Sequence, residues 1–398
     1  MEQQRRRSGF APHRLLSMED VFQTFQWFAQ MRASQPVFYD EQTHLWQIFR
    51  YDDVNEVVTD YNRFSSESLP GFSENTFLEG TIVATDPPQH RKLRNLVNQA
   101  FTPRAVNELS GRVAEITQEL LDDVKERGRL DIVSDIAFPL PAKVIAEMLG
   151  VPAEDWDIFR RWVSGADIAV AKDRESAMRM QHSQEQQMYD YFVQLLDERR
   201  RAPKDDLISD LSVAEVDGER LSERELVSFC LLLLAAGQET TKNLIANAAY
   251  CFTEYPEARE RLMREPGLMQ GAVEEILRYL PPVWFTLRRA KTDLELAGQH
   301  IPANAIIQAW NASANRDAAQ FSEPEHFAIE RQPNKHLSFG HGIHFCIGAP
   351  LARLEANVAL PMILSQLKNL ERVPDVPVRI SAGIVFVIRS LPMTFQAR

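Results

Sequence analysis

One cysteine, Cys346, lies in a glycine-rich stretch whose composition suits a metal ligand or a nucleophile. The segment LSFGHGIHFCIGAP, residues 337–350, places it directly before a helical pattern. Backbone amides and the positive end of a helix dipole favour a thiolate at such a position. The alternative is a buried, unreactive cysteine, which is a common environment for this residue type. The cysteine taken alone leaves both interpretations open.

A second candidate site is the segment AAGQETT, residues 235–241, at the end of a long apolar helical pattern. Its polar groups, above all Glu239 and Thr240, fall where the apolar period predicts burial. Burying such groups costs stability unless they are hydrogen-bonded or needed for function. A helix that simply leaves the core at this point would give the same pattern.

Charged residues form two further candidates. Glu275 and Arg278 in EEILRY have the i,i+3 spacing that places them on one helix face, and such a pair is most commonly an ordinary surface ion pair. The second candidate is a group of four cationic side chains, His90, Arg94, Arg288 and His344. Each of them could equally be a solvated surface group.

The residues around the cysteine have a recognisable spacing. Phe339, Gly342, Cys346 and Gly348 form F-x-x-G-x-x-x-C-x-G, and glycines at these positions would let the backbone lie flat against a large planar ligand. This spacing resembles the haem-binding loop of the cytochrome P450 family, in which the cysteine thiolate is a ligand of the haem iron. The resemblance implies that haem b is the cofactor.

The other candidates are similar to motifs of the same family and occur in the same order. Residues 235–241 resemble its oxygen-activating helix, A-G-x-[DE]-T, and Glu275 with Arg278 resembles its E-x-x-R pair, which a downstream arginine, here Arg331, completes. The resemblance covers roughly residues 35–395. In the family the E-x-x-R group is structural, so we expect these three residues to hold the cysteine loop.

The resemblance assigns roles to the remaining site residues. Cys346 is implied to be the iron ligand, with Glu239 and Thr240 as the acid and hydroxyl that deliver protons. We expect the Thr240 hydroxyl to bond back to a carbonyl and widen the helical turn. The residues implied to contact haem are His90, Arg94, Arg288, His344, Phe339, Gly348 and Ala236. The four cations among them would bind its propionates.

The substrate pocket is placed by offsets from these motifs. The long helix, the segment before Arg288 and the C-terminal region would supply its lining, although each residue could equally be plain core. The expected lining residues are Leu232, Ala235, Trp284, Phe285, Thr286, Ile384 and Val385. Because these side chains are almost wholly apolar, we expect a small apolar substrate.

The resemblance implies a haem-thiolate monooxygenase that inserts one oxygen atom of O₂ into its substrate by hydroxylation or epoxidation. The short chain is similar to bacterial members that take electrons from a ferredoxin or flavodoxin, and Arg91, Arg94 and Arg353 would form a basic patch for that donor. A peroxide-driven peroxygenase is the alternative, but such enzymes typically lack the acid and threonine pair. A non-catalytic haem sensor would need neither a proton relay nor an electron donor.

The pattern along the chain predicts a mainly helical protein with a minor sheet-rich lobe. We expect a hairpin within residues 36–51, a helix capped by Asp52 or Asp53, and a helix capped by Asp86. The further expected helices cover roughly residues 104–128, 141–149, 154–170, 174–201, 222–250, 256–264, 267–280 and 349–368. The resemblance implies the cytochrome P450 fold as one domain over residues 1–398, with haem between the long helix and the cysteine-loop helix and a flexible tail at 1–20.

Composition limits the partners. With 56 acidic and 44 basic residues the net charge is -12, which disfavours nucleic acid and anionic membrane surfaces. The longest apolar run, residues 226–237, is shorter than the roughly 20 residues that cross a bilayer. Three cysteines are too few for a disulfide framework, so we expect a cytoplasmic protein.

Overall fold

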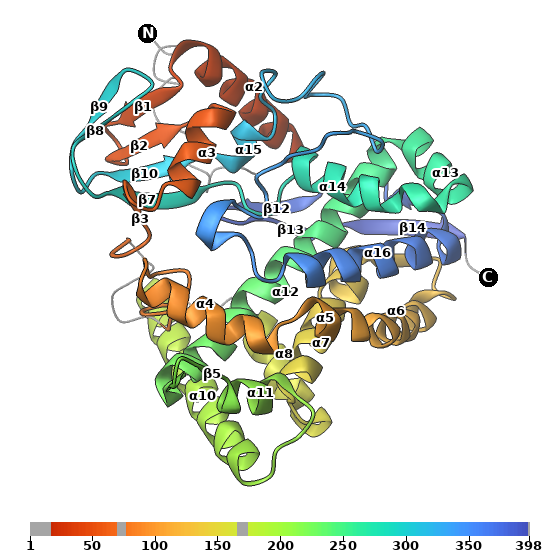
Figure 1. The fold of residues 1–398 in the computed structure, drawn as a ribbon. Coiled ribbons are helices and arrows are strands. Elements are labelled where there is room, and N and C mark those ends of the chain that lie inside the picture. The colour runs from red at the N-terminus through yellow and green to blue at the C-terminus, as the bar shows by residue number, and fades with distance from the viewer. Residues whose placement is uncertain (1–16, 70–76, 165–173, 397–398) are drawn as a thin grey trace.

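A long helix, α12 (Glu223–Glu254), crosses the middle of the molecule, and the other elements pack around it (Figure 1). The structure is a computed structural model that describes residues 17–69, 77–164 and 174–396. A capping box begins α12. The Ser222 hydroxyl accepts a hydrogen bond from the Glu225 N–H, and the Glu225 carboxylate accepts one from the Ser222 N–H at 2.8 Å. The buried apolar run that follows stabilises the helix by packing.

The helices form the larger part of the described structure. In chain order they are α2 (Met18–Ser34), α3 (Tyr51–Thr59), α4 (Gln89–Ala100), α5 (Pro103–Glu108), α6 (Ser110–Val124), α7 (Pro139–Leu149), α8 (Trp156–Ser164), α10 (Arg174–Arg201), α11 (Leu207–Val213), α12, α13 (Pro256–Arg264), α14 (Met269–Tyr279), α15 (Asn311–Ala314) and α16 (Ala349–Gln366). Helix α12 packs against α7, α10, α14 and α16.

The main sheet has five strands in the order β1-β2-β10-β7-β3. Its strands are β1 (Val37–Asp40), β2 (Leu45–Ile48), β3 (Phe64–Ser65), β7 (Thr286–Ala290) and β10 (Ile306–Ala309). Strand β10 runs parallel to β2, and the other neighbours are antiparallel. Figure 1 shows this sheet with α2 and α3 on one side of the molecule, away from α8, α10 and α11.

Smaller strand groups complete the fold. The strands β4 (Arg129–Asp131), β11 (Lys368–Arg372) and β14 (Pro392–Gln396) form one sheet. The pairs are β5 (Glu215–Val216) with β6 (Glu219–Arg220), β8 (Leu294–Leu296) with β9 (Gln299–Ile301), and β12 (Arg379–Ala382) with β13 (Phe386–Ser390). Strand β13 packs against α12, which brings the C-terminal segment to the central helix. The prediction of a mainly helical protein with a minor sheet-rich part is confirmed.

The predicted tail and two predicted helix caps differ from the structure. Helix α2 begins at Met18, inside the expected tail of 1–20, because Ser17 and Asp20 form a capping box; residues 1–16 lie outside the described part. Helix α3 begins at Tyr51 without a side-chain cap, so the expected cap at Asp52 or Asp53 is wrong.

The predicted cap at Asp86 is also wrong. Helix α4 begins at Gln89, and the Asp86 carboxylate is used elsewhere: it accepts a hydrogen bond from the Ser66 N–H at 3.0 Å and pairs with Lys291 at 2.8 Å. The expected helix over 104–128 is two helices, α5 and α6, and α2, α11 and α15 were not predicted. Within the described ranges, no helix is both long enough and apolar enough to cross a membrane.

Candidate functional site

A cavity of about 480 Å³ separates α12 from the loop that carries Cys346. Its walls come from α12, the segment 282–288, the cysteine loop, the start of α16 and the turn between β12 and β13. The predicted site residues that line it are Arg94, Leu232, Ala235, Ala236, Glu239, Thr240, Phe285, Thr286, Arg288, Phe339, His344, Cys346, Gly348, Ile384 and Val385. The fold therefore gathers segments more than two hundred residues apart around one space.

Cys346 faces this cavity from the loop before α16. Its backbone N–H donates to the Phe339 carbonyl at 2.9 Å, and the helix begins three residues later at Ala349. Burial raises the pKa of the Cys346 thiol, although the backbone N–H groups of Gly348 and Ala349 act in the opposite direction. The N–H groups at the helix start therefore favour the thiolate, as expected, but burial has the larger effect on the pKa. A cation bound at the sulfur would reverse this balance.

Gly342 and Gly348, the two glycines of the cysteine motif, lie in different surroundings. Gly342 has φ +68°, and a Cβ there would lie 3.0 Å from the Cα of Thr59, so this glycine permits the loop to pack against α3. This differs from the expected contact with a planar ligand. At Gly348 a Cβ would lie 3.9 Å from the Cys346 sulfur, which is an ordinary contact distance inside the cavity wall.

The four predicted cations gather on one side of the cavity. Arg94, Arg288 and His344 line it, and His90 lies behind them with its ring centroid 4.3 Å from that of His344. Arg288 is 7% exposed and donates to the Leu287 carbonyl at 2.8 Å. Among the described residues, no carboxylate is hydrogen-bonded to any of the four cations.

Burial governs the charge of this group. It lowers the pKa of Arg288 to about 10, of His90 to about 4 and of His344 to about 3. The Nε2 atom of His90 is buried without a hydrogen-bond partner, and His344 Nε2 lies 3.0 Å from the Ser66 hydroxyl. The charge of Asp86 opposes the lowering of the pKa for all three residues, but its carboxylate is hydrogen-bonded to none of their side chains. Buried donors without a partner are costly unless an acceptor such as an anion binds there. The group fits the two propionates of haem.

Glu239 and Thr240 lie on the α12 wall of the cavity. The Thr240 hydroxyl donates to the Ala236 carbonyl at 2.7 Å, as expected. The turn is not widened, however, because α12 is a continuous α-helix from Glu223 to Glu254. Next to this pair, the Glu239 carboxylate accepts a hydrogen bond from Lys242 at 3.1 Å. The sequence analysis missed Lys242, since an i,i+3 pair is usually a surface feature.

Glu275, Arg278 and Arg331 meet in the interior below the cysteine loop. Arg278 donates two hydrogen bonds of 2.8 Å to Glu275, and Arg331 Nε lies 3.1 Å from the same carboxylate. Arg278 also donates to the carbonyls of Asn315 and Pro324 at 3.0 and 2.8 Å. These bonds join α14 to the segments that lead into the cysteine loop, which supports the structural role.

A second network, formed by Arg353, Glu274 and His336, lies beside Phe339 of the cysteine loop. The Arg353 guanidinium lies 4.5 Å from the centre of the Phe339 ring and donates to Glu274 at 2.7 and 2.8 Å. Burial would raise the pKa of Glu274, but hydrogen bonds from Arg353 and His336 lower it to about 2. The network fixes the position of Phe339 in the cavity wall, and the sequence analysis did not find Glu274 or His336.

Trp284 does not line the cavity, so its assignment to the substrate pocket is wrong. It is completely buried and stacks on Phe386 at 5.3 Å, with Phe25 at 5.5 Å. The neighbouring Phe285 does line the cavity. Further apolar lining residues, which were not predicted, come from the segment before α4 and from the helices, among them Phe77, Leu78, Ile82, Val83, Phe229, Leu244 and Leu351.

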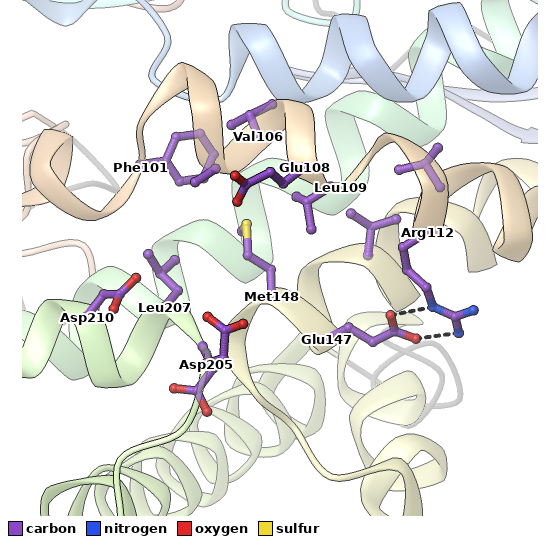
Figure 2. Close-up of a pocket in the computed structure, with 14 residues that line it drawn as sticks. Phe101, Val106, Glu108, Leu109, Arg112, Glu147, Met148, Asp205, Leu207 and Asp210 are labelled. Atoms are coloured by element: carbon purple, nitrogen blue, oxygen red, sulfur yellow. Dashed lines mark hydrogen bonds and ion pairs between the residues drawn. The ribbon is translucent and has the colours of Figure 1, made fainter.

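A second cavity, of about 370 Å³, lies between α5, α6, α7 and the start of α11. Figure 2 shows its acidic side chains, of which Glu147 accepts two hydrogen bonds of 2.8 Å from Arg112. Asp206 is committed to Arg199 and to the Ser209 N–H. No cysteine or histidine is among the described residues that line it. We therefore assign the chemistry to the first cavity.

Comparison with known proteins agrees with this geometry. The family model described as "Cytochrome P450" matches residues 13–149 and 142–395. "Putative cytochrome P450 YjiB" of Bacillus subtilis is 42% identical, over 94% of this chain and 94% of that protein. "Cyclomarin C epoxidase CymV" of Salinispora arenicola is 39% identical, over 89% of this chain and 91% of that protein.

A solved structure has the same architecture. The crystal structure of CYP109E1 from Bacillus megaterium in complex with testosterone has a TM-score of 0.87 and 38% identity, covering 94% of this chain and 99% of that chain. The likeness includes both the helices and the five-stranded sheet, because the matched region covers nearly all of both chains.

Proposed function

The chain belongs to the cytochrome P450 family and is a haem-thiolate monooxygenase, and we propose that it hydroxylates or epoxidises a small apolar molecule. The cofactor is haem b. Bound haem supplies the activation of dioxygen and the insertion of one oxygen atom into the substrate. The other steps described below concern what the residues of this chain do.

Cys346 is the residue that would ligate the haem iron. It lines the cavity at the loop before α16, and it is the cysteine of the three that lies in a cavity wall, since Cys230 and Cys251 are completely buried in α12. Arg94, Arg288 and His344 would bind the propionates, with His90 supporting His344 from behind. This convergence of one cysteine with a buried cationic group is the observation that carries the proposal.

Glu239 and Thr240 would deliver protons on the α12 side of the same cavity. Both side chains lie in the wall formed by α12, while the sulfur comes from the separate cysteine loop. Their neighbours on this wall, Leu232, Ala235 and Ala236, are apolar, so the carboxylate and the hydroxyl are groups there that are suited to order water and transfer protons. A peroxygenase would not need this pair, so its presence favours the use of dioxygen.

The substrate would occupy the apolar part of the cavity. Leu232, Phe285, Ile384 and Val385 line this part, together with the alanines of α12. Apolar walls with few polar groups favour an apolar ligand. The relatives support this class, because CYP109E1 has been crystallised with testosterone and CymV is named as an epoxidase.

A ferredoxin or flavodoxin of the cytoplasm would supply the electrons. The basic patch expected from Arg91, Arg94 and Arg353 does not support this partner. Arg94 lines the cavity, and Arg353 is paired with Glu274 at 2.7 Å, which leaves Arg91 as the one of the three that is exposed. The proposal of this partner therefore rests on family membership alone.

Turnover with isotopically labelled dioxygen tests the proposed function. The holoenzyme is supplied with a ferredoxin, its reductase and NADH, and with apolar compounds chosen because they shift the haem spectrum from low to high spin. We expect one labelled oxygen atom in the product. Product that forms with hydrogen peroxide and never with dioxygen would support the peroxygenase instead.

A further inference from the structure

Lys242 of α12 is a buried lysine whose charged end is directed to a residue of the cavity wall. The residue is 7% exposed, and its Nζ donates to Glu239 Oε1 at 3.1 Å. Glu239 lines the cavity, whereas Lys242 does not. An ammonium group out of water is stabilised only when an opposite charge or several acceptors lie beside it. Lys242 therefore stays paired with Glu239, because leaving the pair would leave its charge buried without a partner.

The surroundings of Lys242 leave Glu239 as its counter-ion. Burial lowers the pKa of Lys242, the charge of Glu239 raises it, and the charge of Arg389 lowers it further. Arg389 belongs to β13, which packs against α12, and it is exposed and bonded to the Ser381 hydroxyl at 2.9 Å. Among the described residues, Glu239 is the one acidic group within salt-bridge distance of Lys242.

The same pair also defines where Glu239 is held. A glutamate side chain has three rotatable bonds and loses conformational entropy when it is fixed. The i,i+3 bond holds its carboxylate toward Lys242, nearer the C-terminal end of α12. Glu239 directly precedes Thr240, whose hydroxyl is hydrogen-bonded to the Ala236 carbonyl. Without the lysine, the Glu239 side chain would lose this hydrogen bond and regain its rotational freedom.

We propose that Lys242 is a positioning residue for proton delivery, holding the Glu239 carboxylate in a fixed place beside Thr240. A carboxylate that is held in one place can order the water through which protons pass, whereas a freely rotating one cannot. Lys242 acts only through Glu239 and does not touch the substrate. The inference rests on the proposed monooxygenase function and deepens it.

The test uses the holoenzyme with Lys242→Met and Lys242→Arg. We expect Lys242→Met to lower the product formed per NADH about 10-fold, a usual cost of losing an orienting partner, and to release peroxide instead. Its substrate-induced spin shift should stay at the parent value. Lys242→Arg keeps the charge and the donor and should restore most of the coupling. Lys143→Met, which removes a lysine from the half-exposed pair with Glu119, is the control and should match the parent.

Full coupling in Lys242→Met, or a Lys242→Arg variant as uncoupled as Lys242→Met, would overturn the inference.

These outcomes are separate from failure of the proposed function. If the reduced parent protein with carbon monoxide lacks the red-shifted Soret band of thiolate-ligated haem, or if the parent never uses dioxygen, the monooxygenase proposal fails. If the parent couples NADH to product and the Lys242 variants behave like it, only the role of Lys242 is wrong.

Discussion

The Thr240 hydroxyl donates a hydrogen bond of 2.7 Å to the Ala236 carbonyl, one turn earlier on α12. Both residues line the cavity that Cys346 faces. In its resting position the hydroxyl proton is thus committed to the backbone. The oxygen can still accept a hydrogen bond from a group in the cavity, but it must exchange the bond to Ala236 to donate one. The exchange needs no movement of the helix itself, because α12 is regular at this point.

We predict that Thr240→Ala uncouples oxygen consumption from product formation. Loss of a group that transfers protons commonly costs about 10²-fold or more in the step it serves, so we expect most of the NADH consumed to appear as peroxide. Substrate affinity should change little, because the pocket walls remain. Product and peroxide per NADH are the quantities to measure. Thr240→Ser keeps the hydroxyl and should retain coupling, and a fully coupled Thr240→Ala would show that the hydroxyl is not in the proton path.

The buried Glu275 carboxylate should be needed for stability and not for chemistry. Glu275 and Arg278 are both completely buried, and removing one partner of such a pair typically costs about 3–5 kcal/mol. We expect Glu275→Gln to lower the free energy of unfolding by an amount of this order and to release haem more readily. The control is Glu330→Gln, in the half-exposed pair with Arg261, which should cost about 1 kcal/mol or less. Equal effects of the two changes would contradict the structural role.

Glu355 of α16 should make stability depend on pH. It is completely buried, neither carboxyl oxygen has a hydrogen-bond partner, and burial raises its pKa to about 8. In the unfolded chain a glutamate titrates near ~4.3. Between these two values the folded state holds a proton that the unfolded state has lost, so the free energy of unfolding falls as pH rises from about 4 to about 8.

Thermal unfolding between pH 5 and 8 checks this prediction. Glu355→Gln removes the titrating group, so its unfolding temperature should fall less than that of the parent as pH rises. Glu257→Gln changes an exposed glutamate of α13 and should follow the parent. Parallel curves for the parent and Glu355→Gln would contradict this prediction, and would mean that water or a neighbouring group hydrogen-bonds to the Glu355 carboxylate.

The sequence predicted the site well where spacing within a short segment determines the contact. The cysteine loop and the start of its helix are local, so Cys346 and Phe339 could be placed from the pattern, as could the bond from Thr240 to a carbonyl one turn back. The four cations required the family resemblance, because nothing local shows that Arg94 and Arg288 lie on one cavity.

The parts that could not be predicted depend on tertiary packing. Trp284 and Phe285 are adjacent apolar residues, and only the packing of Trp284 against Phe386 and Phe25 assigns one to the core and the other to the cavity. The pair of Glu239 with Lys242 has the spacing of an ordinary surface pair, and the burial of Lys242 is visible only in the fold. The raised pKa of the Cys346 thiol is likewise a property of the whole structure.

The identity of the iron ligand is the central claim, and the spectrum of the reduced protein with carbon monoxide tests it most directly. Thiolate-ligated haem gives a strongly red-shifted Soret band, which we expect for the parent, for Cys230→Ala and for Cys251→Ala, since burial raises the pKa of both these thiols and neither lines the cavity. Cys346→Ser should abolish the band while the protein remains folded by circular dichroism. An unaltered band in Cys346→Ser would contradict the assignment of Cys346 as the ligand.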